Sequence, residues 1–167
     1  QNLPSERKNA MKKRLLSLLL ILCLCAALLP VTALAAETTV TDETDLRTAL
    51  SKGGTVKLGG NIKLAAALEI NNTVTLDLNG YEIARGEYVG EINAVNIKGG
   101  GHLTLTDSSN GIGAISDFDG SVHVLAGGTF TMNGGRLLAG RALGGDIRAR
   151  GGGVLVDKDG LFVMNGG

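Results

Sequence analysis

Acidic side chains in the C-terminal half of the chain are the first candidates for chemistry. They are Asp117 and Asp119 in "DFDG", Asp146, and Asp157 and Asp159 in "DKDG". Glycoside hydrolysis needs two carboxylates at a fixed separation, and a polysaccharide lyase needs calcium-binding oxygens with a basic residue. The chain contains an internal repeat, described below, and these acids occupy different aligned positions (columns) of it. They therefore do not form one cluster. Asp-Gly turns account for them, and we predict no catalytic residue and no cofactor.

The two histidines, His102 and His123, also occupy different columns of the repeat. A shared metal site would need ligands that converge, so we predict no metal site. The glycine clusters are not phosphate-binding loops, because no Lys-Ser/Thr pair follows them and they connect short strands.

A basic stretch between residues 136 and 150 is the only predicted binding feature. It carries Arg136, Arg141, Arg148 and Arg150 within "GGRLLAGRALGGDIRARGGG", with Asp146 among them. Arginine can grip a carboxylate or sulfate through two hydrogen bonds. We therefore name Arg141, Asp146, Arg148 and Arg150 as candidate binding residues for a glycan or protein ligand, with a solvated loop as the alternative.

The arginine-bearing stretch lies between two copies of a sequence repeat. "AVNIKGGGHLTLTDS" (94–108), "SVHVLAGGTFTMNGG" (121–135) and "GVLVDKDGLFVMNGG" (153–167) align without a gap. Shorter relatives precede them at 55–64 and 68–80. The second step along the chain, from 121 to 153, is longer than the first, from 94 to 121. The arginine-bearing stretch causes this difference, and insertions in repeat proteins form loops, often on the binding face.

Apolar residues recur at a spacing of two within each repeat, which is the pattern of short strands with one buried face. Threonine fills many of the intervening, outward positions. The predicted core ladder comprises Val74, Leu76, Val95, Ile97, Leu103, Leu105, Val122, Val124, Phe130, Met132, Val154, Val156, Phe162 and Met164.

Two arrangements of these strands are possible. Antiparallel hairpins joined at Asn-Gly would give a sandwich, but like residues would not then lie beside like. Parallel stacking places Phe130 on Phe162 and Met132 on Met164. We therefore predict an all-β fold, a parallel β-helix or solenoid of about four coils. Its third strands would contain Ile83, Ile112/Ile115 and Leu137/Leu138.

A short amphipathic helix is predicted before the repeats, in "TDETDLRTALSKGG" (41–54). Thr41 is the predicted N-cap, and Leu46, Ala49 and Leu50 form the apolar stripe. Gly53 ends the helix. Such a helix would cover the open edge of the first coil.

The N-terminus has the features of a secretory signal peptide. Met11 is followed by three basic residues, an apolar run from 15 to 29, and the small-x-small site Ala33-Leu34-Ala35. A membrane anchor would need a run of ~20 apolar residues. We predict an upstream extension (1–10), a signal peptide (11–35) cleaved after Ala35, a capping segment (36–54) and the β-helix coils (55–167).

The chain after Ala35 has no cysteine and therefore no disulfide framework. It carries 11 Lys and Arg against 15 Asp and Glu, a net charge of about −4. An acidic chain does not attract nucleic acid by counterion release, so we predict no nucleic-acid partner. Contact with a membrane is expected only through the signal peptide during export.

The signal peptide, "LRTAL", "TVTLDLNGYEI", "GHLTLTDSSNGIGAI" and the repeated "GGTFTMNGG" together resemble secreted adhesin-like β-helix proteins of Gram-positive, often gut, bacteria. These proteins are similar in fold to the right-handed β-helices of the pectate-lyase superfamily. The resemblance spans 41–167 and implies a right-handed helix that is secreted or displayed on the cell surface.

Two functions are compatible with the resemblance. The first is a non-catalytic adhesive or structural stalk. The second is the N-terminal part of a β-helix polysaccharide lyase or glycoside hydrolase, with its catalytic coils beyond Gly167. Since Gly167 falls in the middle of a coil, we expect further coils or an anchor after it in either case.

Overall fold

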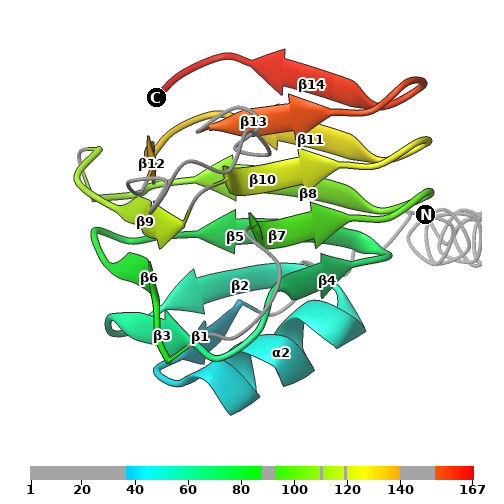
Figure 1. Ribbon diagram of the computed structural model, residues 1–167. Coiled ribbons are helices and arrows are strands. Elements are labelled where there is room, and N and C mark those ends of the chain that lie inside the picture. The colour runs from blue at the N-terminus through cyan, green and yellow to red at the C-terminus, as the bar shows by residue number, and fades with distance from the viewer. Residues whose placement is uncertain (1–36, 88–92, 110, 119, 140–152) are drawn as a thin grey trace, which may run out of the picture. The chain divides into compact units, whose positions relative to one another are not determined.

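The computed structural model describes residues 37–87, 93–109, 111–118, 120–139 and 153–167. The predicted upstream extension and signal peptide lie outside these residues. The described part of the chain is mostly β-structure in parallel sheets, with one helix (Figure 1). The predicted all-β class and the parallel pairing are thereby confirmed.

Three sheets make up this part of the chain. Sheet A has the order β1 (Thr38–Val40), β2 (Gly54–Leu58), β5 (Thr73–Asp77), β8 (His102–Thr106), β11 (Thr129–Met132), β14 (Leu161–Met164). Sheet B contains β3 (Ile62–Leu64), β6 (Glu82–Arg85), β9 (Ala114–Phe118) and β12 (Arg136–Ala139). Sheet C contains β4 (Leu68–Ile70), β7 (Asn93–Ile97), β10 (Gly120–Val124) and β13 (Val154–Val156). From β2 onward, the chain visits sheets A, B and C in turn.

The register of the strands reproduces the alignment of the repeats in the sequence. Phe130 pairs with Leu103 of the preceding repeat and with Phe162 of the following one. In sheet C, Val122 pairs in the same way with Val95 and Val154. Like residues therefore lie beside like, as parallel stacking requires and hairpin pairing does not.

Glycine ends the turn that leads from sheet C into sheet A in three successive repeats. The amide nitrogens of Gly101, Gly128 and Gly160 donate to the carbonyl three residues earlier, at 2.8, 2.9 and 3.0 Å. A Cβ atom at Gly128 would lie 2.8 Å from the carbonyl oxygen of Ile97 in the preceding repeat. The glycine column of the sequence is thus explained by the close approach of adjacent turns.

One apolar core runs between the three sheets and beneath the helix. Ten members of the predicted ladder, from Val74 to Met132, are at most 4% exposed. The four in the last repeat are less buried: Val154 and Phe162 are partly buried, whereas Val156 and Met164 are 40% and 59% exposed. No described strand follows these four in their sheets, so they lack the next layer of contacts within the described residues.

The third strands contain most of the residues predicted for them. Ile83 and Ile115 are fully buried, and Leu137 packs against the core. The prediction was wrong for Ile112, which is 62% exposed and precedes β9. Leu138 lies in β12 as predicted, and alternation along the strand turns its side chain outward, where it is 41% exposed.

Helix α2 (Glu43–Lys52) lies across the end of the fold where β1 to β4 meet (Figure 1). Leu46, Ala49 and Leu50 are buried, and Gly53 is the C-cap, as predicted. The predicted N-cap was wrong: Asp42, not Thr41, is extended and accepts from the Asp45 amide at 2.9 Å. The N-cap is the residue whose carbonyl accepts the first hydrogen bond of the helix. Here the Leu46 amide donates to the Asp42 carbonyl.

Candidate functional site

The predicted binding residues Arg141, Asp146, Arg148 and Arg150 lie outside the described residues. The structure does fix where their segment leaves and rejoins the fold. It follows β12 in sheet B and ends at Gly153, whose carbonyl accepts from the Val122 amide at 3.0 Å. The segment therefore begins and ends at the corner between sheets B and C. Arg136 lies in β12 instead and donates to the Ile112 carbonyl at 3.0 Å.

Connections at this corner vary most in length. Residues 65–67 join β3 to β4, residues 86–92 join β6 to β7, and Asp119 alone joins β9 to β10. Residues 140–153 join β12 to β13. By contrast, the last three connections from sheet C to sheet A, at 98–101, 125–128 and 157–160, are equal in length. The connections from sheet A to sheet B also differ, with residues 107–113 as long as residues 86–92, but the range of lengths is widest at the corner between sheets B and C. Variable connections are common on the binding face of repeat proteins.

The outer face of sheet C carries a row of paired polar side chains, which extends into the connections from sheet C to sheet A. In successive strands, Glu69, Asn96 and His123 occupy one column. The Asn96 side-chain amide donates to Glu69 at 2.9 Å, and Lys98 Nζ lies 2.7 Å from Glu69 Oε2. His123 Nε2 lies 3.0 Å from Asp157 Oδ1. We call these five residues the sheet C polar row.

The Glu69 carboxylate is held ionised within this row. Burial alone would raise its pKa, but hydrogen bonds from Asn96 and Lys98 and the positive charge of Lys98 lower that pKa below its ordinary value. A carboxylate in this state accepts hydrogen bonds and does not donate a proton. Glu69 therefore does not serve as a general acid in this row.

Two further aspartates, Asp77 and Asp107, lie where sheet A turns toward sheet B. Asp107 accepts from the amides of Gly113 and Gly80, at 2.7 and 2.8 Å. Asp77 accepts from the amides of Asn79 and Ser108, both at 2.9 Å.

These contacts fix the protonation state of both aspartates. Burial would raise the pKa of each carboxyl, yet its hydrogen bonds hold that pKa below the ordinary value. A glycoside hydrolase of the two-carboxylate type needs one acid with a raised pKa. Asp77 and Asp107 hold turns instead of forming such a pair.

Two of the other acids named in the sequence, Asp117 and Asp159, have a left-handed backbone conformation. Asp159 occupies the left-handed region with φ of +67°, the position that Gly100 and Gly127 occupy in the two preceding turns. Asp117 has φ of +65° and is exposed at the end of β9. Asp119 and Asp146 lie outside the described residues.

The histidines lie on different sheets, His102 on β8 and His123 on β10. Within the described ranges, no group of three or more His, Cys, Asp or Glu side chains is arranged to hold a metal ion.

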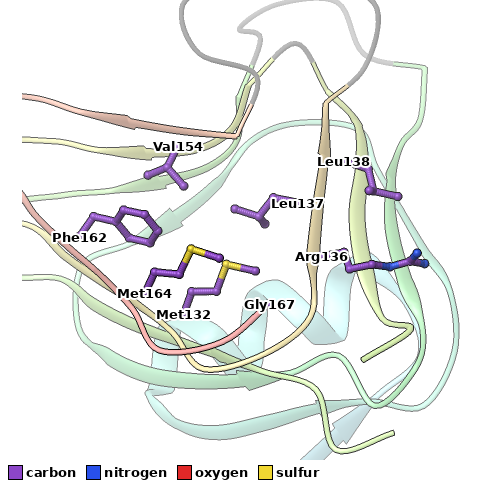
Figure 2. Close-up of a pocket in the computed structure, with 8 residues that line it drawn as sticks. All are labelled: Met132, Arg136, Leu137, Leu138, Val154, Phe162, Met164 and Gly167. Atoms are coloured by element: carbon purple, nitrogen blue, oxygen red, sulfur yellow. The ribbon is translucent and has the colours of Figure 1, made fainter. Parts of the chain in front are cut away.

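An apolar hollow of about 510 Å³ opens at the end of the fold opposite α2. Figure 2 shows Phe162, Met132, Met164 and Leu137 around it, whereas Arg136 and Leu138 lie to one side. The hollow is the top of the core, exposed where β12, β13 and β14 form the last described layer. Nothing in the sequence pattern indicates it, because its lining residues match those of the buried repeats.

No protein-family model, curated protein or solved structure matches the chain. The helix in the described part of the chain is too short and too polar to cross a membrane.

Proposed function

We propose that the chain is a secreted or surface-displayed bacterial module, built as a right-handed parallel β-helix of about four coils. Its role is adhesive or structural and not catalytic. The observation that carries the proposal is the in-register stacking of repeats, which extends from β2 to β14 in sheet A. Right-handed connection is the rule for parallel strands joined within one sheet.

The chemistry of the described acids supports a non-catalytic role. Glu43, Glu69, Asp77 and Asp107 all have a lowered pKa, and each accepts hydrogen bonds from within the fold. They build the module and stay ionised. Ligand binding is then assigned to the corner between sheets B and C, where the connections vary most in length and the arginine-bearing segment begins and ends.

The proposed ligand is an acidic glycan or an acidic protein surface, bound through Arg141, Arg148 and Arg150. Arginine recognises carboxylate or sulfate by paired hydrogen bonds, and the rest of the chain after Ala35 is acidic. The binding would therefore be local to this corner and would weaken as salt is added.

The test measures retention of the chain on an immobilised sulfated or carboxylated polysaccharide. Replacing Arg141, Arg148 and Arg150 by Ala should abolish retention. The control replaces three exposed lysines elsewhere, Lys52, Lys63 and Lys158, by Ala, which removes the same charge. Equal retention by both triple variants would refute the assignment of this corner.

The same preparation tests for catalysis. Incubation with the acidic polysaccharide should release no new reducing ends and no unsaturated products. Release of either product would favour the alternative, a lyase or hydrolase, and would overturn the non-catalytic role.

A further inference from the structure

The chain contains Asn-Gly pairs, in which the asparagine side chain is open to attack by the backbone amide that follows it. The pairs are Asn79–Gly80, Asn110–Gly111, Asn133–Gly134 and Asn165–Gly166. Glycine has no Cβ to keep its amide nitrogen away from the side-chain carbonyl carbon. Attack in the folded chain therefore depends on what holds that amide and that side chain. The structure describes three of these pairs in full, whereas Asn110 lies outside the described residues.

Both reacting groups of Asn79–Gly80 are held by other parts of the fold. The Gly80 amide donates to Asp107 Oδ1 at 2.8 Å, and Asn79 Nδ2 donates to the Leu58 carbonyl at 3.0 Å. The Gly80 nitrogen would have to give up a hydrogen bond to a charged acceptor, which is stronger than a neutral one. The fold therefore protects Asn79.

The corresponding groups of Asn133–Gly134 are available for reaction. The Asn133 side chain is exposed, and the Gly134 amide has no hydrogen-bond acceptor among the residues that the structure describes. In the following repeat, by contrast, the Gly166 amide donates to the Met132 carbonyl at 3.2 Å. Of the three described pairs, Asn133–Gly134 is thus the one whose attacking nitrogen is not held by another described group.

A neighbouring side chain also activates the Asn133 amide. Asn165 Nδ2 donates to Asn133 Oδ1 at 2.8 Å. Attack on the side-chain carbonyl carbon moves negative charge onto Oδ1, and a donor already placed at that oxygen stabilises the charge, as in an oxyanion hole. Asn165 therefore favours the reaction of Asn133 from the following repeat.

We infer that Asn133 is a site of spontaneous covalent modification, at which its side-chain amide is lost as ammonia. The Gly134 nitrogen forms a bond to Asn133 Cγ, and the Cγ–Nδ2 bond breaks. The proton lost by the Gly134 nitrogen leaves with Nδ2 as part of the ammonia, and a five-membered succinimide ring remains. Water then opens this ring at either carbonyl and gives aspartate or isoaspartate.

The products change the turn between β11 and β12. Both add a negative charge where Asn133 was neutral, and isoaspartate also lengthens the main chain by one carbon atom. β12 leads directly into the arginine-bearing segment. The modification therefore alters the chain path just before the proposed ligand-binding corner.

The test incubates the folded 167-residue chain at mildly alkaline pH and follows each asparagine separately by peptide mass spectrometry. Asn133 should be converted at least about tenfold faster than Asn79, because only Gly80 must break a hydrogen bond to a charged acceptor. In the urea-unfolded chain the two rates should become similar. A rate at Asn133 no higher than that at Asn79 in the folded chain would overturn the inference. A difference that persists in urea would place its cause in the local sequence and not in the fold.

The variant Asn165→Ala tests the activating contact. Removal of the donor should slow the conversion of Asn133 by about threefold to tenfold, the usual effect of one hydrogen bond. Lys158→Ala, an exposed substitution in the same repeat, is the control and should leave the rate unchanged. Unchanged or faster conversion in the Asn165 variant would refute the role of Asn165 as a donor.

The variant Asp107→Ala tests the protection of Asn79. It frees the Gly80 amide and should speed the conversion of Asn79, and circular dichroism would verify that the variant is folded. An unchanged rate at Asn79 in the folded variant would refute the protective contact. If the variant does not fold, the ratio of the Asn133 and Asn79 rates in the unchanged chain still decides the inference.

Discussion

The rings of Phe130 and Phe162 stack with their centroids 5.2 Å apart and their planes 11° from parallel. The two residues belong to successive repeats separated by the longest connection, yet they are directly paired between β11 and β14. A long connection therefore leaves the register of the core unchanged. The repeat fixes which residues stack, and the connections at one corner absorb the difference in length.

Phe130 and Phe162 should contribute unequally to stability, because only Phe130 is fully buried. Phe130→Ala should lower the free energy of unfolding by about 3–5 kcal/mol, the usual cost of deleting a buried aromatic ring. Phe162→Ala should cost less, about 1–2 kcal/mol. Urea denaturation would measure both losses, and an equal loss would contradict the described layering.

The turn glycines should resist substitution where adjacent turns touch. Gly128→Ala would press a Cβ against the Ile97 carbonyl at 2.8 Å and should cost about 1–3 kcal/mol of unfolding free energy. Gly60→Ala is the control, since nothing lies within 4 Å of a Cβ there. Thermal unfolding of both variants would measure the difference. Equal melting temperatures would show that the turns do not pack as described.

The clamp between α2 and the chain before β4 should hold the helical cap in place. Glu43 accepts from the Ala65 amide at 2.9 Å, and Arg47 donates to the Ala67 carbonyl at 2.9 Å. Arg47→Ala should lower the unfolding free energy by about 1–3 kcal/mol because hydrogen bonds involving a charged group are lost. Thr44→Ala, exposed on the same helix, should change it by less than about 0.5 kcal/mol.

Hydrogen exchange of the α2 amides would locate this effect. Faster exchange in α2 of the Arg47 variant, but not of the Thr44 variant, is the expected result. Unchanged exchange in both would mean that the clamp does not hold the helix.

Stability should fall at acidic pH because four carboxyls, those of Glu43, Glu69, Asp77 and Asp107, have lowered pKa values. Hydrogen bonds hold the pKa of Asp77 and Asp107 below 3.8, and those to Glu43 hold its pKa below 4.5. A lowered folded-state pKa adds stability above the unfolded-state value, and that stability is lost as the pH falls through the folded-state value.

Asp107→Asn should therefore destabilise the chain near neutral pH and flatten the loss of stability at pH values below the ordinary pKa of an aspartate. Denaturation midpoints measured across the acid range would show this. A variant curve parallel to that of the unchanged chain at all pH values would contradict the assigned role of Asp107.

If the N-terminal segment is a signal peptide cleaved after Ala35, the exported chain should have a single mature N-terminus. Expression in a Gram-positive secreting host should release a chain that begins at Ala36, as measured by intact mass and N-terminal sequencing. Ala35→Gln, which removes the small residue from the cleavage site, should leave the precursor uncleaved. Cytoplasmic retention of the uncleaved chain would contradict the predicted secretion.

The strands and their partners could be predicted well from the sequence, because stacked repeats carry similar residues at aligned positions. Columns such as Val95, Val122 and Val154 align between repeats, and the paired positions follow from that alignment alone. The glycines after each turn are likewise readable, since a close approach of backbones excludes a side chain.

Other features leave no such trace. The sequence did not indicate β1, which pairs with β2 but lacks the repeat pattern. Asp42 and Thr41 are both good caps, and only the chain path into α2 selects between them. The sheet C polar row brings together side chains from successive repeats, such as His123 and Asp157. Alignment of the columns could have placed neighbours in one column side by side, but not the reach of each side chain.

The central claim is that strands separated by whole repeats, and not strands adjacent in sequence, are neighbours in the sheets. Nuclear magnetic resonance of the labelled chain tests it most directly, through backbone proton contacts between strands. Contacts linking Thr75 to Thr104 and Thr104 to Thr131 are predicted, as in sheet A. Antiparallel contacts between β7 and β8, or between β10 and β11, would contradict the parallel stack.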